Sequence, residues 1–447
     1  MKTEKSMEQP KESMLRKDGV SYLVPFILIT SCFALWGFAN DITNPMVKAF
    51  SKIFRMSATD GALVQVAFYG GYFAMAFPAA IFIRRYSYKA GVLVGLGLYA
   101  LGAFLFYPAK LSSDYYPFLV AYFILTCGLS FLETSSNPYI LSMGTEQTAT
   151  RRLNLAQSFN PMGSLLGMFV AMNFIQARLS PLDTQARSTL TPDQFEAVKE
   201  YDLGVLIGPY LIIGAVILVM FLVIMFASMP KNGDKNHDIN FVPTIKRIFS
   251  LPHYREGVIA QFFYVGVQIM CWTFIIQYGT RVLMAEGMTE QMAEVTSQRY
   301  NIIAMVIFCC SRFVCTFMLR YVNTGVLLAA LAVVGGVLVA GVIGFQDIRG
   351  LYCLVGVSAC MSLMFPTIYG IALTGLGDDA KFGAAGLIMS ILGGSVLPPL
   401  QASIIDCGEL FGMPAVNVSF VLPLVCFVVI AIYGWRTYLR SKGQLQG

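Results

Sequence analysis

The sequence has little charge. Only 13% of its 447 residues are charged, whereas soluble domains carry about 25%. Hydrophobic residues make up 56% of the chain, and the mean hydropathy is +0.66. This composition excludes a soluble globular protein and indicates a polytopic membrane protein. The net charge of +6 does not indicate nucleic-acid binding, because the basic residues fall in short loops.

Histidine is also scarce: His237 and His253 are the two in the chain, and both fall in one loop. A histidine-based metal or catalytic site is therefore not expected. The ten cysteines are scattered, mostly inside apolar runs, with no CxxC pair and no metal-ligand spacing, so we interpret them as reduced core residues. There is no nucleophile–base pair and no cofactor motif. These absences predict a protein that is not an enzyme and that holds no metal or cofactor.

Apolar runs of about 20 residues, long enough to cross a bilayer as helices, recur along the whole chain. We expect twelve such helices, at 22–50, 61–84, 89–108, 115–143, 154–177, 205–228, 255–284, 296–319, 325–345, 350–374, 383–406 and 415–436. The most polar long connection follows the sixth run. The prediction is therefore an all-α membrane protein with a tail at 1–20 and two six-helix halves, at 21–229 and 255–447. A loop at 230–254 joins the halves.

The distribution of basic residues predicts the orientation. With both termini in the cytoplasm, 20 of the 31 lysines and arginines fall in cytoplasmic segments, as positively charged loops prefer. The first twenty residues lack the apolar core and cleavage site of a signal peptide, so we expect a cytoplasmic tail. We therefore expect a multi-pass protein of a bacterial inner membrane.

The two halves resemble each other weakly. The sequence NPYI at 137–140 is echoed by FPTI at 365–368, and GSLLG at 163–167 is echoed by GGSVL at 393–397. Two related six-helix halves are typical of secondary transporters, whose substrate site lies between the halves near the bilayer midplane. Proline and glycine in such helices are tolerated where they pack against neighbours or line a cavity.

Two carboxylates lie inside apolar runs, Glu133 in the fourth and Asp41 in the first. An ionisable group in hydrocarbon is costly, so such residues usually face a protein interior or a watery cavity and mark proton or ion relays. Burial in general favours the neutral form of a carboxylate, which allows it to bind and release a proton near neutral pH. The alternative is a structural ion pair with Arg312 or Lys48.

Several stretches resemble the L-fucose:proton symporter family of the major facilitator superfamily. They are LWGFAN at 35–40, AFYGGYF at 67–73, YKAG at 88–91, LET at 132–134, NP at 137–138, RLNLAQSFN at 152–160, AQF at 260–262, YVG at 264–266, Gln268, CW at 271–272, RF at 312–313 and FPTI at 365–368. The resemblance implies proton-driven import of a monosaccharide by alternating access. It implies a polar cavity and a coupling role for Glu133, and sugar-binding side chains at Gln157 and Asn160.

The sequence departs from the family pattern at three places. On the first helix the family has Asn, two residues, then the proton-carrying Asp, whereas here Asp41 precedes Asn44, on the same helix face. Phe365 replaces a family tyrosine, and the superfamily's usual aspartate is absent from 83–91. We predict that Asp41 carries the coupling proton and that Glu133 responds to both sugar and protonation.

Amide and aromatic side chains complete the predicted sugar site. Asn44 and Asn137, as well as Gln157 and Asn160, have amides that could bind hydroxyls or join helices to one another. An aromatic platform, with Gln268 beside it, could cover the apolar face of a sugar, although single aromatics are more often core residues or interfacial anchors. The members of this group are Trp36, Tyr264, Gln268, Trp272 and Phe365.

The predicted function is proton-coupled uptake of a monosaccharide, L-fucose above others, by a monomer in the bilayer. Two alternatives stay open: a transporter of glucose, galactose or another hexose, which sodium could drive instead, and a transporter-like sugar sensor. Arg312 could act as a gate or pack between helices, and the segment 378–381 is expected to be a solvated loop with at most a gating ion pair.

Overall fold

The computed structural model describes residues 14–17, 20–43, 50, 53–55, 63–175, 178–180, 182, 184–230 and 241–443. Almost all of them are helical. The helices before residue 230 are α1 (Leu23–Thr43), α4 (Leu63–Arg85), α5 (Tyr88–Ser112), α6 (Tyr116–Ser142), η1 (Glu146–Thr148), α7 (Ala149–Gln157), α8 (Phe159–Val170), η2 (Ala171–Ile175), α9 (Thr184–Ser188) and α10 (Pro192–Phe226).

The helices after residue 240 begin with a short linker helix. They are α11 (Phe241–Ser250), α12 (Pro252–Ala285), α13 (Glu290–Met318), α14 (Thr324–Gly344), α15 (Ile348–Met361), α16 (Met364–Leu373), η4 (Gly377–Asp379), α17 (Ala380–Met389), η5 (Ser390–Leu392), α18 (Gly393–Ile405), α19 (Ala415–Ser419) and α20 (Val421–Ser441). Two small antiparallel pairs complete the fold: β1 (Arg16–Lys17) with β2 (Val20–Ser21), and β3 (Glu409–Leu410) with β4 (Met413–Pro414).

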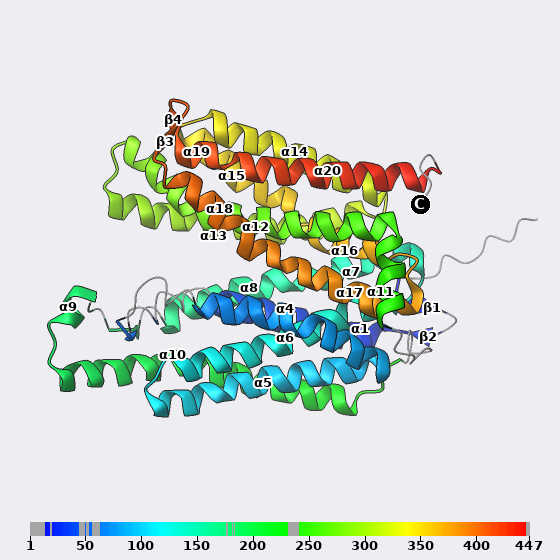
Figure 1. Ribbon diagram of the computed structural model, residues 1–447, viewed down its shortest axis with the longest axis horizontal. Coiled ribbons are helices and arrows are strands. Elements are labelled where there is room, and N and C mark those ends of the chain that lie inside the picture. The colour runs from blue at the N-terminus through cyan, green and yellow to red at the C-terminus, as the bar shows by residue number, and fades with distance from the viewer. Residues whose placement is uncertain are drawn as a thin grey trace, which may run out of the picture.

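Figure 1 shows two groups of helices lying side by side: a first group, α1 to α10, and a second group, α12 to α20. The helix α11, the β1–β2 pair and the C-terminus lie at one end, here called the α11 end. The helix α9 and the β3–β4 pair lie at the opposite end, the α9 end. One large core cluster lies mainly in the first group and includes buried residues of α16 and α17 as well, while a second cluster lies in the second group. The two groups therefore share packed surface through α16 and α17.

Among the described residues, ten helices are long and apolar enough to cross a membrane. The two remaining predicted spans are shorter for different reasons. The apolar part of α1 is Leu23–Ala39, and the fifth span is divided at Ser158 into α7 and α8. The twelve-helix prediction is consistent with these elements.

The sixth helix corrects the predicted boundaries. It was expected at 205–228, after a long connection, but α10 already begins at Pro192. Thr191 caps its first turn, because its side chain accepts a hydrogen bond from the Gln194 backbone and the Gln194 side chain bonds back. Proline at the first helical position costs no hydrogen bond. The prediction from apolar runs did not include this extension, because its residues are polar.

Close helix contacts in each group occur at glycines. A Cβ atom at Gly163 of α8 would collide with the backbone of Ala34 in α1, and one at Gly393 would collide with the backbone of Phe262 in α12. Small residues permit such close backbone approach between membrane helices. The two glycines belong to the echoed sequences GSLLG and GGSVL, so the sequence repeat corresponds to the same kind of helix contact in each group.

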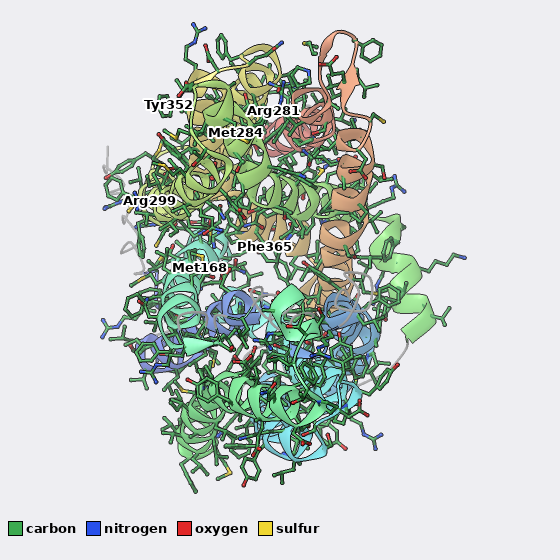
Figure 2. All side chains as sticks on the ribbon, turned by 90° about the vertical axis from the view of Figure 1, so that its left-hand side faces the viewer. Met168, Arg281, Met284, Arg299, Tyr352 and Phe365 are labelled. Carbon is green, nitrogen blue, oxygen red and sulfur yellow. The ribbon has the colours of Figure 1, made fainter. Side chains whose placement is uncertain are left out.

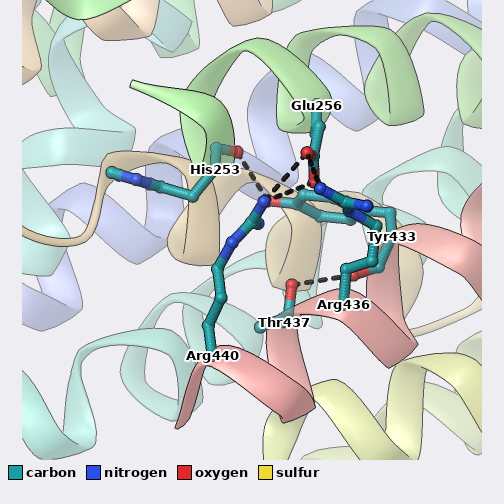
Figure 3. A network of polar contacts seen from close by, with 6 residues as sticks. All are labelled: His253, Glu256, Tyr433, Arg436, Thr437 and Arg440. Carbon is teal, nitrogen blue, oxygen red and sulfur yellow. Dashed lines mark hydrogen bonds and ion pairs between the residues drawn. The ribbon is translucent and has the colours of Figure 1, made fainter. Parts of the chain in front are cut away.

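Figure 3 shows a polar network that joins the start of α12 to the end of α20 at the α11 end. Glu256 accepts from Arg436 at 2.9 Å and from Arg440 at 2.8 Å. The hydroxyl of Tyr433 donates to the backbone oxygen of His253 at 3.4 Å. These contacts lie within the second group and hold its first and last helices together.

Candidate functional site

Two prolines shape the helices that face each other between the groups. A helical N–H normally donates to the carbonyl four residues earlier, and proline has no N–H. Pro161 in α8 therefore leaves the Gln157 carbonyl without its helical partner, and Pro366 in α16 does the same for Ser362. Both sites fall beside a helix break, at Ser158 and at Ser362.

Glu133 lies deep in the first group. Its residue is 6% exposed, and its Oε1 accepts a hydrogen bond from the Tyr72 hydroxyl of α4 at 2.9 Å. In the described part of the chain, no ion pair joins Glu133 to Arg312, so the alternative of a structural ion pair between these two residues has no support. Lys48, the other partner considered, falls outside the described residues.

A hydrogen-bonded chain leads from Glu133 to the fifth span. The Asn137 side-chain nitrogen donates to the Glu133 backbone oxygen at 3.0 Å, and the Asn137 oxygen accepts from the Gln157 nitrogen at 2.7 Å. Asn137 is fully buried, and Gln157 is nearly so. These hydrogen bonds engage the Gln157 side-chain nitrogen and so restrict the orientation of an amide that lines the cavity.

A cavity of about 200 Å³ lies between the two groups. The side that the first group contributes is mostly polar and aromatic: Trp36, Asp41, Phe68, Tyr69, Tyr72, Glu133, Gln157, Asn160, Pro161 and Ser164. The side that the second group contributes is mostly apolar: Val265, Gln268, Ile269, Trp272, Met305, Phe308, Arg312, Phe365 and Ile391. Phe365 is seen between the two groups when the molecule is viewed from the α9 end (Figure 2).

The cavity brings together most of the predicted site. Asp41, Glu133, Trp36, Gln157 and Asn160 line it from the first group. Three predicted residues line it from the second group: Gln268, Trp272 and Phe365. The predicted proton and sugar residues thus share one space, and their individual roles stay predictions.

Three predicted residues are placed differently. Asn137 is not among the lining residues; it lies behind Gln157 and its amide is used in the chain described above. Tyr264 is also buried away from the cavity, where its hydroxyl donates to the Met361 backbone oxygen at 3.1 Å and its ring contacts Phe365. Asn44 falls outside the described residues.

The sequence reasoning missed several lining residues, of which the tyrosines of α4 carry the most chemistry. Tyr69 and Tyr72 are three residues apart, on the face that also carries Phe68. Their spacing within AFYGGYF was available as a signal. What the sequence does not show is that this face is opposite Glu133, since the hydrogen bond joins residues 61 positions apart.

The two groups are joined by polar contacts toward the α11 end. Arg84 of α4 donates to the Asp378 carbonyl and lies 3.9 Å from the Asp379 carboxylate. The Gly375 backbone N–H donates to Glu146 at 3.2 Å. The prediction of a solvated loop at 378–381 is wrong, because the segment forms η4 and the start of α17 and Lys381 is fully buried. The ion pair expected there is present. Arg247 of α11 pairs with the same Asp379 carboxylate.

A second set of contacts lies deeper, next to the cavity. The Asn154 side chain donates to the Thr367 hydroxyl at 3.1 Å, and Arg312 donates to the Gln157 backbone oxygen, also at 3.1 Å. From Gln157 onward, α8 runs toward the α9 end (Figure 1) and carries the lining residues Asn160, Pro161 and Ser164, so the cavity lies on the α9 side of these bonds. The structure therefore has the two groups in contact at the α11 end, with the polar cavity beyond that contact.

Comparison with known proteins identifies the family. A sequence profile of the Major Facilitator Superfamily matches residues 29–398. An L-fucose-proton symporter of Haemophilus influenzae is 52% identical over 427 residues, which cover 94% of this chain and 98% of that protein. The chain belongs to the L-fucose-proton symporter family of the Major Facilitator Superfamily.

The chain is also similar to a solved fucose:proton symporter and to a transporter of other hexoses. A crystal structure of the Escherichia coli fucose:proton symporter superposes with a TM-score of 0.84, at 33% identity, over 94% of this chain and 99% of that one. A glucose/galactose transporter of Brucella abortus is 29% identical over 409 residues, 91% of this chain and 92% of that protein. The protein is therefore a multi-pass membrane transporter with the major facilitator fold, and it is not an enzyme.

Proposed function

We propose that this protein imports L-fucose together with protons across a bacterial inner membrane by alternating access. The observation that carries the proposal is the single cavity in which two carboxylates, Asp41 and Glu133, lie with Gln157 and Asn160 opposite an apolar wall. The 52%-identical relative from Haemophilus influenzae is an L-fucose-proton symporter, which supports the choice of sugar and of coupling ion. The related glucose/galactose transporters keep those hexoses as the second candidate substrates.

The two walls suit a 6-deoxy sugar. L-Fucose has hydroxyl groups on its ring and a methyl group where other hexoses have a hydroxymethyl group. In the proposed complex, the amides of Gln157 and Asn160 bind hydroxyls, because each amide offers donors and an acceptor. Trp272 and Phe365 cover apolar C–H groups and the methyl group. Gln268, on the same wall, supplies one polar contact, and Trp36 closes the site from the first group.

Two of the predicted sugar ligands take other roles in this proposal. Asn137 orients Gln157 through its 2.7 Å hydrogen bond rather than binding sugar itself. Tyr264 supports the Phe365 ring from behind. Asn44, which falls outside the described residues, remains a predicted ligand.

In this proposal Asp41 and Glu133 have different roles in proton coupling. We infer that Asp41, which is partly exposed, exchanges the coupling proton, and that Glu133 links protonation to the sugar through Asn137 and Gln157. A buried carboxylate marks a relay more often than a structural element in membrane proteins. Because both acids share the cavity with the proposed sugar ligands, protonation and sugar binding can be coupled there.

The orientation and the moving parts are also proposals. Arg84 and Arg85 end α4 at the α11 end, and Arg436 and Arg440 end α20 there, so we infer that this end is cytoplasmic. The chain then has both termini inside, and its two groups, 21–229 and 255–447, move against each other as a monomer around the linker 230–254. With this orientation, we infer from the contacts between the groups at the α11 end that this form is closed to the cytoplasm.

The test uses intact cells that make the protein, in unbuffered medium. Adding L-fucose should raise the external pH, and a proton ionophore should abolish the rise. Asp41→Asn should lose the pH change, whereas Asp193→Asn, which alters an exposed acid at the start of α10, should keep it. Labelled fucose uptake without a pH change, and dependent on sodium, would overturn the proton assignment. An absence of fucose uptake, with uptake of another hexose, would overturn the sugar.

A further inference from the structure

Arg312 is a buried cation that none of the assigned roles uses. It lies 22 residues into α13, is 3% exposed, and lines the cavity. In the described residues it forms no ion pair with a carboxylate. Its charge is instead met by two backbone carbonyls and by the ring of Phe308, whose centroid lies 4.6 Å from the guanidinium carbon.

The two carbonyls are those that the prolines leave free. The Nε–H of Arg312 donates to the Ser362 oxygen, and Nη1 donates to the Gln157 oxygen at 3.1 Å. Pro366 and Pro161 stand four residues after these carbonyls, so neither carbonyl can have its usual helical donor. An unbonded buried carbonyl is costly. One guanidinium therefore satisfies both vacancies, with its donors in a fixed planar fork.

The two carbonyls belong to different groups of helices. Ser362 lies between α15 and α16, and Arg312 lies on α13, so both belong to the second group. Gln157 is the last residue of α7 in the first group. If the α11 end opens, α7 must separate from α13 and α16. The bond to Ser362 can persist during that motion, and the bond to Gln157 must break.

We propose that Arg312 is a positioning residue that latches α7 to the second group and thereby favours the form closed at the α11 end. The bond it makes across the groups is on the backbone of Gln157, whose side chain is a proposed sugar ligand. Displacement of α7 thus changes the latch and the sugar site in one movement. This inference concerns the conformational equilibrium and holds for whichever sugar the cavity takes, while its link to binding rests on the proposed function.

The expected effect follows from the loss of one charge-assisted hydrogen bond across the groups. Arg312→Met removes both carbonyl contacts and leaves an apolar side chain about as long as the arginine side chain up to Nε. Arg312→Lys keeps the charge but lacks the planar fork. We expect the population open at the α11 end to increase about tenfold in Arg312→Met, which corresponds to about 1.4 kcal/mol, and by less in Arg312→Lys. Arg320→Lys, at an exposed arginine just after the end of α13, is the matched control for Arg312→Lys.

The reporter is a cysteine in the contact between the groups. Thr150 of α7 lies against Gly370 of α16, where an added Cβ would come within 2.8 Å of the threonine hydroxyl. Thr150→Cys should be shielded in the closed form and reactive when the α11 end opens. Its labelling rate by an impermeant maleimide is measured in inside-out vesicles, after subtraction of the rate without Thr150→Cys. The labelling rate should rise in the order Arg320→Lys, Arg312→Lys, Arg312→Met.

A second variant tests the proline argument and covers a failure of Arg312→Met to fold. Pro161→Ala restores an N–H that competes for the Gln157 carbonyl, so it should raise labelling in the same direction but by less. Its effect should largely vanish when Arg312→Met is already present, because the bond it weakens is then gone. Unchanged labelling in Pro161→Ala and in the Arg312 variants would overturn the latch.

Sugar measurements separate this inference from the proposed function. Molecules closed at the α11 end are those that can bind external sugar in this proposal. Loss of the latch lowers the fraction of such molecules, so the apparent affinity for external L-fucose should fall by the same factor as that fraction. Weaker fucose binding in Arg312→Met with normal labelling would mean that Arg312 is a direct sugar ligand, and would overturn the latch. Absence of fucose transport in the unmodified protein would overturn the proposed sugar and leave the labelling result valid.

Discussion

The contact between Asn137 and Gln157 offers a decisive test of how the sugar site is built. In Asn137→Ala, the Gln157 amide nitrogen loses its acceptor at 2.7 Å, and the Glu133 backbone oxygen loses its donor at 3.0 Å. Both groups are buried, so the loss is not repaired by bulk water. A buried donor left unsatisfied costs about 1–3 kcal/mol. If that cost falls on the sugar-bound form, the affinity for L-fucose decreases about 5- to 150-fold.

The assay is a double-mutant cycle on sugar binding. Equilibrium binding of labelled L-fucose to purified protein is compared among the unmodified chain, Asn137→Ala, Gln157→Ala and the double variant. If Asn137 acts by orienting Gln157, Asn137→Ala weakens binding little further in a protein that already carries Gln157→Ala. The coupling energy between the two substitutions is then about 1–3 kcal/mol. Ser403→Ala, at an exposed serine whose hydroxyl donates to the Pro399 backbone oxygen within α18, should bind sugar normally.

Additive effects would refute this account. If Asn137→Ala weakened binding as much in the Gln157→Ala protein as in the unmodified protein, Asn137 would act on the sugar independently. The original prediction of a direct sugar contact for Asn137 would then hold. A loss of folding in Asn137→Ala would appear as a lower thermal midpoint, and Asn137→Asp, which keeps the acceptor for Gln157, would then provide the comparison.

Three further predictions concern the ends of the helices and their packing. Asp379→Asn should lower the population closed at the α11 end, because Arg84, whose side chain is 4% exposed, loses its carboxylate partner. That population should also depend less on salt concentration. Thr150→Cys labelling at low and high salt measures both effects. Arg187→Met should lower the free energy of unfolding by about 3–5 kcal/mol, since it leaves Asp202 charged and buried. Adding Asp202→Leu should restore part of that loss. Unfolding curves of the unmodified protein, Arg187→Met and the double variant measure it. Gly163→Val should prevent normal assembly, because its Cβ would meet the α1 backbone, and yield of folded protein in gel filtration measures this.

Much of the fold follows from local properties of the chain. Hydropathy alone places the spanning helices, because a run of apolar residues has the same meaning wherever it packs. The errors occur where hydropathy carries no information. The polar extension of α10 from Pro192 depends on a capped first turn, and the division of the fifth span at Ser158 reflects a proline three residues later.

The site is predictable in part for the same reason. Glu133 and Asp41 were selected because a carboxylate in an apolar run is costly anywhere, so the sequence is sufficient to suspect function. Tyr72 was missed because tyrosine is common in such helices. Its hydrogen bond to Glu133 exists only once α4 and α6 are packed together.

The sequence by itself determined that this is a membrane protein of two related halves, with acids and amides in otherwise apolar helices. Tertiary structure alone decided which of these groups meet. It placed Asn137 behind Gln157, and it brought Arg312 to the carbonyls of Gln157 and Ser362, 155 and 50 positions away. The physical reason is that a proline shows which carbonyl lacks a helical partner, whereas the donor that fills the vacancy comes from a distant helix. Its identity is decided by packing.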